Sequence, residues 1–163
     1  MRAREVKHAP TTAYADLICT LLHCMRQDGA AAAAHAQALI AVAREHGLVT
    51  QSAFGSFLEP WSRWHLAKSK AVLNEMRAGI ATCREHAIGI FVPFFAATLA
   101  DAEAQAGERD AALATIDGVI ADIERGGQRW CEAEASHPRR DFVEERSVEY
   151  GARRGSPPTI ATD

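Results

Sequence analysis

Three segments of the sequence align with one another, without a gap, at a constant offset of 40 residues: AQALIAVAREHGL (Ala36–Leu48), MRAGIATCREHAI (Met76–Ile88) and IDGVIADIERGGQ (Ile116–Gln128). In all three segments the fifth residue is isoleucine and the sixth is alanine. A fixed period of roughly 20 to 50 residues is typical of arrays in which identical structural units stack on one another. The repeat therefore predicts a stacked array of about three units.

Each unit is predicted to contain two helices separated by a short polar joint. Apolar residues recur at i, i+3, i+4 and i+7, which places one apolar stripe along a helix. In the first unit the stripes fall at positions 14, 17, 18, 21 and 25 of the first helix, and at positions 33, 36, 40 and 43 of the second. Ile80 and Leu113 occupy the second-helix stripe of later units, so both are predicted to be buried between helices.

Helix boundaries follow from the same pattern. Pro10 and Pro93 are expected at helix starts, where the missing N–H costs little. Pro60 falls inside a helix and is expected to kink it. The predicted helices span residues 11–26, 30–46, 50–67, 70–86, 92–106, 110–125 and 128–137.

Composition supports an all-α fold. Alanine, the best helix former, accounts for 33 of the 163 residues, and no run alternates apolar and polar residues as a strand does. We expect an all-α protein, an α-α superhelix of about three helix-turn-helix repeats. Residues 1–10 are predicted to be a lead-in and 11–137 the repeat domain. Residues 138–163 are predicted to be a mostly disordered tail, in which 141–150 could form a short helix.

The charge balance excludes several classes of partner. With 18 Lys and Arg against 21 Asp and Glu, the chain carries a net charge of −3, so neither nucleic acid nor a membrane surface is an expected partner. The uncharged stretch Ala87–Ala100 is shorter than the roughly 18 residues of a spanning helix. The basic N-terminus lacks the apolar run of a secretory signal. We therefore expect a cytoplasmic protein whose four cysteines are free thiols.

The stretch Pro93–Glu134 resembles a known family. It is similar to the tetratricopeptide-like C-terminal helical-repeat arm of bacterial adenylate/guanylate cyclases and STAND-class ATPases, and the resemblance extends over about residues 8–134. Two departures stand out: Pro60 replaces the usual glycine before Trp61, and the pattern stops after Glu134. The matching residues are Pro93, Phe94, Phe95, Leu99, Ala100, Ala106, Gly107, Leu113, Ala114, Asp117, Gly127, Arg129, Trp130, Glu132, Ala133 and Glu134.

The resemblance implies a tetratricopeptide-like solenoid that acts by binding. The sequence contains no G-x-x-x-x-G-K-[ST] phosphate loop and no carboxylate pair on a predicted strand. We therefore expect a non-catalytic protein-interaction or regulatory module, a stand-alone or truncated arm of a signalling regulator, with no catalytic residue, cofactor or metal. A protein or peptide partner is expected, and the oligomeric state is left open. The alternative is a small ligand- or metal-binding helical domain that uses Cys and His groups between helices.

Two pairs of side chains are candidates for that alternative. Cys19 and His23 lie one turn apart on one predicted helix, and Cys83 and His86 lie three residues apart on another. A zinc site needs three or four ligands that converge from more than one segment, so ordinary core and surface roles are favoured for these residues.

Trp64 and Arg63 form the candidate interaction surface. Trp64 occupies a mostly apolar position of the repeat, so core burial is its first interpretation and an interaction hot spot its second. The recurring triplets Arg44-Glu45-His46 and Arg84-Glu85-His86 fall at corresponding helix ends. There, cations interact favourably with the helix dipole, and this explanation is preferred to acid–base chemistry.

Overall fold

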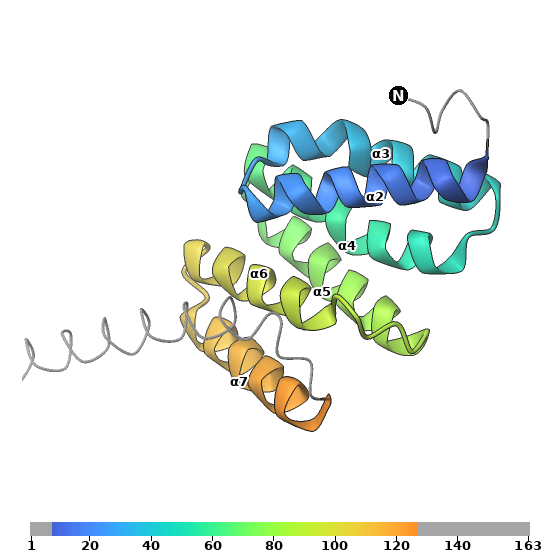
Figure 1. Cartoon of the computed structure of the whole chain (residues 1–163). Helices are drawn as coiled ribbons and strands as arrows, with labels where there is room; N and C mark the ends of the chain where they lie inside the picture. Colours follow the sequence, from blue (N-terminus) through green and yellow to red (C-terminus); the bar gives the residue numbers. More distant parts are fainter. Residues whose placement is uncertain (1–7, 127–163) are drawn as a thin grey trace, which may run out of the picture.

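The computed structural model describes residues 8–126, and this part of the chain is all-helical (Figure 1). Successive helices run antiparallel and pack in succession, as expected for a helical-repeat superhelix, so the predicted fold class is confirmed. The predicted helix 128–137 and the tail 138–163 lie outside the described residues. The helices are α2 (Ala9–Met25), α3 (Gly29–Glu45), α4 (Val49–Leu66), α5 (Lys70–Glu85), α6 (Val92–Gln105) and α7 (Arg109–Gly126).

The helix ends follow from local chemistry. Pro10 and Pro93 lie in the first turns of α2 and α6, as predicted. The Asp28 carboxylate accepts a hydrogen bond from the Ala31 amide at 3.0 Å and so caps the start of α3. Gly47, in the turn after α3, has a φ of +62°, a left-handed conformation that glycine adopts without strain.

Close contact between α4 and α5 depends on Gly79. A Cβ atom at this position would lie 2.5 Å from the Ser56 carbonyl oxygen and 2.7 Å from the Phe57 Cα. The Ser56 carbonyl is the one that Pro60, which has no N–H, leaves without its usual helical donor. Helix α4 nevertheless continues through Pro60 to Leu66. The two helix backbones can therefore touch only because residue 79 has no side chain.

Helix α6 is held to its neighbours mainly by aromatic and polar side chains. The Phe95 ring stacks on Phe57 of α4 at a centroid distance of 4.4 Å and meets the edge of Phe54 at 6.0 Å. Glu103, which is 1% exposed, accepts hydrogen bonds from Arg77 of α5 at 2.9 Å and from Thr115 of α7 at 2.8 Å. This carboxylate ties three helices together.

The buried stripes differ from the predicted ones by about one residue. On α2 the predicted stripe includes Tyr14 and Met25, which are 59% and 57% exposed. Ile80 is buried as predicted, but the prediction for Leu113 is wrong, because Leu113 is only half-buried. The buried positions are 13, 16, 17, 20, 21 and 24 on α2, 29, 32, 36, 39 and 43 on α3, and 112, 116 and 119 on α7.

Candidate interaction surface

Trp64 lies in the core of the fold. It is 2% exposed, and the Lys68 ammonium group lies 6.0 Å from the centroid of its ring. The repeat pattern favours this burial because the equivalent positions of the other units are mostly apolar. The indole is therefore not displayed on the surface of the isolated chain, and of the two predicted surface residues only Arg63 is accessible.

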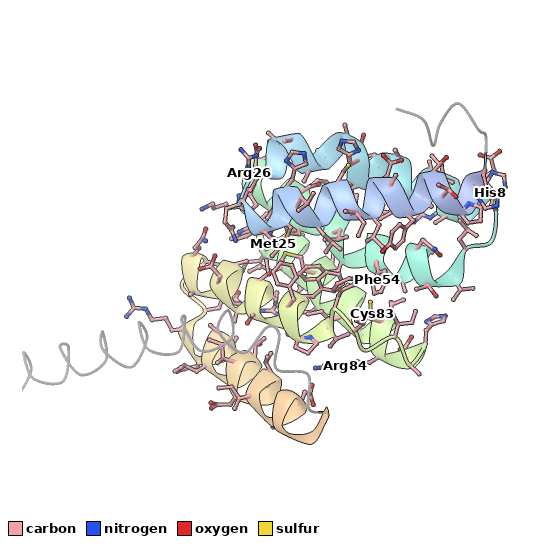
Figure 2. The ribbon with its side chains drawn as sticks, in the orientation of Figure 1. His8, Met25, Arg26, Phe54, Cys83 and Arg84 are labelled. Atoms are coloured by element: carbon pink, nitrogen blue, oxygen red, sulfur yellow. The ribbon has the colours of Figure 1, made fainter. Side chains whose placement is uncertain are left out.

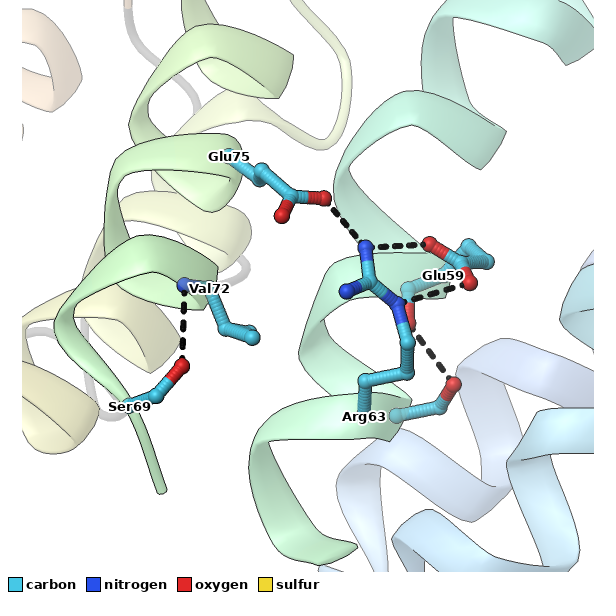
Figure 3. A network of polar contacts seen from close by, with 6 residues as sticks. Glu59, Arg63, Ser69, Val72 and Glu75 are labelled. Atoms are coloured by element: carbon cyan, nitrogen blue, oxygen red, sulfur yellow. Dashed lines mark hydrogen bonds and ion pairs between the residues drawn. The ribbon is translucent and has the colours of Figure 1, made fainter. Parts of the chain in front are cut away.

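Arg63 is accessible but already paired with two carboxylates (Figure 3). Its Nε atom donates to Glu59 Oε1 at 2.8 Å and its Nη2 atom to Glu59 Oε2 at 3.0 Å, and Nη2 also contacts Glu75 of α5. These hydrogen bonds, first to Glu59 and then to Glu75, raise the pKa of the guanidinium. Arg63 thus links α4 to α5, and its charge is largely compensated within the chain.

The two predicted Cys–His pairs do not meet. Cys83 is buried, and its thiol donates to the Ala53 carbonyl at 3.4 Å, whereas His86 is exposed at the end of α5. Cys19 and His23 lie on a different helix, α2. Within residues 8–126, no group of three or more His, Cys, Asp or Glu side chains is arranged to hold a metal ion.

His23 instead lies beside a histidine that the sequence did not single out. Its ring stacks on His35 of α3 at a centroid distance of 6.0 Å and an interplanar angle of 17°. His35 Nδ1 is 2.8 Å from Oδ1 of Asp16, a carboxylate that is 3% exposed. A carboxylate bound to one ring nitrogen fixes the orientation of the imidazole.

A pocket of about 240 Å³ lies where the end of α3, the start of α4 and the end of α5 meet. Its polar lining comes from Arg44, Ser52, Thr82 and His86. The recurring triplets at residues 44–46 and 84–86 therefore contribute to the same pocket, through Arg44 and His86. The volume is below the roughly 300–1,000 Å³ of typical small-molecule sites.

Among the described residues 8–126, the outward side of α2 is apolar and exposed. Tyr14, Leu22 and Met25 are 59%, 55% and 57% exposed, and Ile18 on the same side is half-buried. Figure 2 shows Met25 at the C-terminal end of this helix. Asp16, the only Asp, Glu, Lys or Arg between Ala9 and Met25, is buried against α3. The near absence of charge from residues 9–25 is the sequence signal that could have identified this surface.

No helix among residues 8–126 has both the length and the apolar character needed to cross a membrane. Comparison of the chain with protein-family models, with curated proteins and with solved structures finds no match.

Proposed function

We propose that the chain is a non-catalytic protein-interaction module, and that the exposed side of α2 is the surface that binds. The observation that supports this proposal is a set of three large apolar side chains that are each more than half exposed, those of Tyr14, Leu22 and Met25. They lie on a side of α2 where no residue between Ala9 and Met25 is charged. Exposed apolar patches that exceed a few hundred Å² mark interaction sites on soluble proteins.

The tetratricopeptide-like resemblance of residues 93–134 supports the same class of function. Arms of this kind in cyclase- and STAND-type signalling proteins are regulatory and non-enzymatic, so the proposed partner is a signalling protein or a peptide segment of one. Arg63, the charged residue of the predicted surface, is already paired within the chain. Because the exposed side of α2 between Ala9 and Met25 carries no charged residue, apolar contact would contribute most to selecting the partner.

A double variant tests this proposal. Leu22→Lys/Met25→Lys places two cations in the last turn of α2, where the helix dipole favours them. The matched control is Leu66→Lys/Ile90→Lys, which changes two apolar residues that are 64% and 55% exposed. Purified full-length proteins are compared in affinity capture from a lysate of the source cells, with quantitative mass spectrometry. We expect the α2 variant to lose the proteins captured by the wild type and the control to retain them. Identical capture by all three would contradict the proposal.

Metal binding by histidines between helices is a second candidate, favoured by the stacked rings of His23 and His35 and by the Asp16 carboxylate behind His35. It is the weaker candidate because only two imidazoles converge, and a stable zinc site needs three or four ligands. Titration of the purified chain with Zn²⁺ in a calorimeter tests it, with His35→Gln as the control. Saturable binding that disappears in His35→Gln would favour this function, and the absence of binding would remove it.

A further inference from the structure

The pocket where α3 ends, α4 begins and α5 ends is lined by a cation and, among the residues that the structure describes, by no carboxylate. Arg44 of α3 supplies the cation, and the other polar lining residues are Ser52, Thr82 and His86. None of these described lining residues is Asp or Glu, although acidic residues outnumber basic ones in the chain. Within residues 8–126, the Arg44 side chain forms no hydrogen bond or ion pair. Its charge is therefore available to a ligand.

The equivalent junction one repeat later, where α5 ends, α6 begins and α7 ends, shows how such an arginine is used. At the offset of 40 residues, Arg84 corresponds to Arg44. By the same offset, Asp122 of α7 corresponds to Thr82 of α5. The Arg84 Nη2 atom donates to the Asp122 carboxylate at 3.2 Å, whereas the Thr82 hydroxyl donates to the Ala78 carbonyl at 3.0 Å. Among the described residues, the earlier junction thus lacks the acid that the later one supplies from within the chain.

From this comparison we infer that the pocket binds a small monocarboxylic acid, whose carboxylate takes the place that Asp122 holds at the later junction. Arginine and a carboxylate form charge-assisted hydrogen bonds, often two at once. The Ser52 hydroxyl, half-buried in the first turn of α4 and bonded to no described residue, can donate to the same carboxylate. The inference is independent of the binding role proposed for α2, because no residue of Ala9–Met25 lines this pocket.

The surroundings of Arg44 leave its positive charge in excess. Helices α3 and α5 end at the pocket and α4 begins there, so two partial negative charges and one partial positive charge, each of about half a unit, lie beside the full charge of Arg44. The neighbouring Glu45 is exposed to water and lies 4.0 Å from the His46 imidazole. His86 directs Nδ1 to the Thr82 carbonyl at 2.9 Å, so its Nε2 atom remains for a ligand. The pocket therefore favours an anion.

The size and the apolar walls of the pocket set the rest of the ligand. Its volume of about 240 Å³ equals that of about eight water molecules, so the ligand has on the order of eight non-hydrogen atoms. Leu48, Val49 and Ala53 supply apolar surface, and Val49 is 57% exposed. A short alkyl chain would cover this surface and remove it from water. Hexanoic acid has this size, with a carboxylate at one end and an alkyl chain at the other.

Titration of the full-length protein with sodium hexanoate at constant ionic strength, followed by NMR of the backbone amides, tests the inference. The wild type should bind with a dissociation constant of about 0.1–1 mM, and the shifted amides should lie within residues 43–53 and 82–86. Hexanamide, which is neutral and has the same size, should bind at least about tenfold more weakly. Inorganic phosphate should also bind more weakly than hexanoate, because it leaves the apolar walls uncovered.

Two matched pairs of variants identify the groups that act. Arg44→Met should weaken hexanoate binding at least about tenfold. Its control, Arg26→Met, removes an exposed arginine at the end of α2, which does not line the pocket, and should bind like the wild type. Thr82→Asp supplies from within the chain the acid that Asp122 supplies to Arg84, so it should abolish binding. Thr82→Asn has the same size without the charge and should retain binding. The same spectra show whether each variant is folded.

Four results would overturn the inference. An equal loss in Arg26→Met and Arg44→Met would mean that only the overall charge of the protein matters. Binding by Thr82→Asp at wild-type strength would mean that the carboxylate does not take the place equivalent to that of Asp122. Tighter binding of inorganic phosphate than of hexanoate would assign the pocket to a different anion. Unshifted amides in residues 43–53 at hexanoate concentrations up to about 20 mM would mean that the pocket holds no such acid.

Discussion

Helices α2 and α6 have similar compositions and different surroundings. Each carries few charged residues, Asp16 in α2 and Asp101 and Glu103 in α6. In α6 all residues from Val92 to Ala100 are buried, whereas α2 leaves one side exposed. An apolar helix of this kind is ordinarily buried all round. The comparison therefore shows that, within residues 8–126, neighbouring helices bury α6 from Val92 to Ala100 on all sides and leave one side of α2 exposed.

The cause of the difference is position in the array. Helix α6 contacts α4 through the phenylalanine rings, α5 and α7 through Glu103, and α2 through a hydrogen bond between Thr98 and Cys24. Helix α2 is the first helix described and packs on α3 and α4 (Figure 1). The inward and outward sides of α2 can thus be distinguished by how much substitutions on each side lower the unfolding free energy. Substitutions in α6 give the loss expected for complete burial.

The largest expected loss of stability comes from a substitution in α6. Phe95→Ala removes a fully buried ring that contacts four other phenylalanines, so it should cost about 3–5 kcal/mol of unfolding free energy. Urea unfolding followed by circular dichroism measures this cost. A loss below about 1 kcal/mol would mean that α6 is not packed as described.

A pair of leucines on α2 gives the next contrast. Leu17 is 2% exposed and Leu22 is 55% exposed, on different sides of the same helix. Leu17→Ala should cost about 2–4 kcal/mol of unfolding free energy, and Leu22→Ala less than about 0.5 kcal/mol, when both are measured by urea titration at the same protein concentration. Equal losses from the two variants would show that both sides of α2 support the fold.

Thiol labelling compares the two sides without changing the sequence. Burial raises the pKa of the Cys24 thiol, although the hydrogen bond with Thr98 opposes the shift, and burial raises the pKa of Cys83 to about 11. At pH 8 only about a thousandth of Cys83 is then thiolate, the reactive form. Among the three cysteines of residues 8–126, iodoacetamide should label the half-buried Cys19 first, and labelling of Cys83 should rise with pH toward 11. Peptide mass spectrometry measures the order in which the cysteines are labelled. Early labelling of Cys24 would contradict the burial of its side of α2.

The sequence predicted the fold well because the repeat constrains it. The offset of 40 residues fixed the number and order of the described helices, and their observed ends lie within two residues of the predicted ones. Proline and glycine account for much of this agreement, since Pro10, Pro93 and Gly47 each mark a helix end through their backbone chemistry.

The sequence could not predict which side of α2 faces inward. Tyr14, Ile18, Leu22 and Met25 make one apolar stripe, and Ala13, Leu17, Leu21 and Cys24 make another, so periodicity alone gives no preference. The stripe with the smaller residues packs inward because small side chains let helices approach closely. The contact between His35 and His23 could not be predicted from the sequence either, because it depends on how α3 packs on α2.

The central claim is that the exposed side of α2 serves binding and contributes little to the fold. The most direct test is the unfolding free energy of Leu22→Lys/Met25→Lys, measured by urea titration at about 1 μM protein. The variant is expected to match the wild type within about 0.5 kcal/mol, because both side chains lie more than half in solvent. A loss of about 2 kcal/mol or more would contradict the claim and assign these residues to the core.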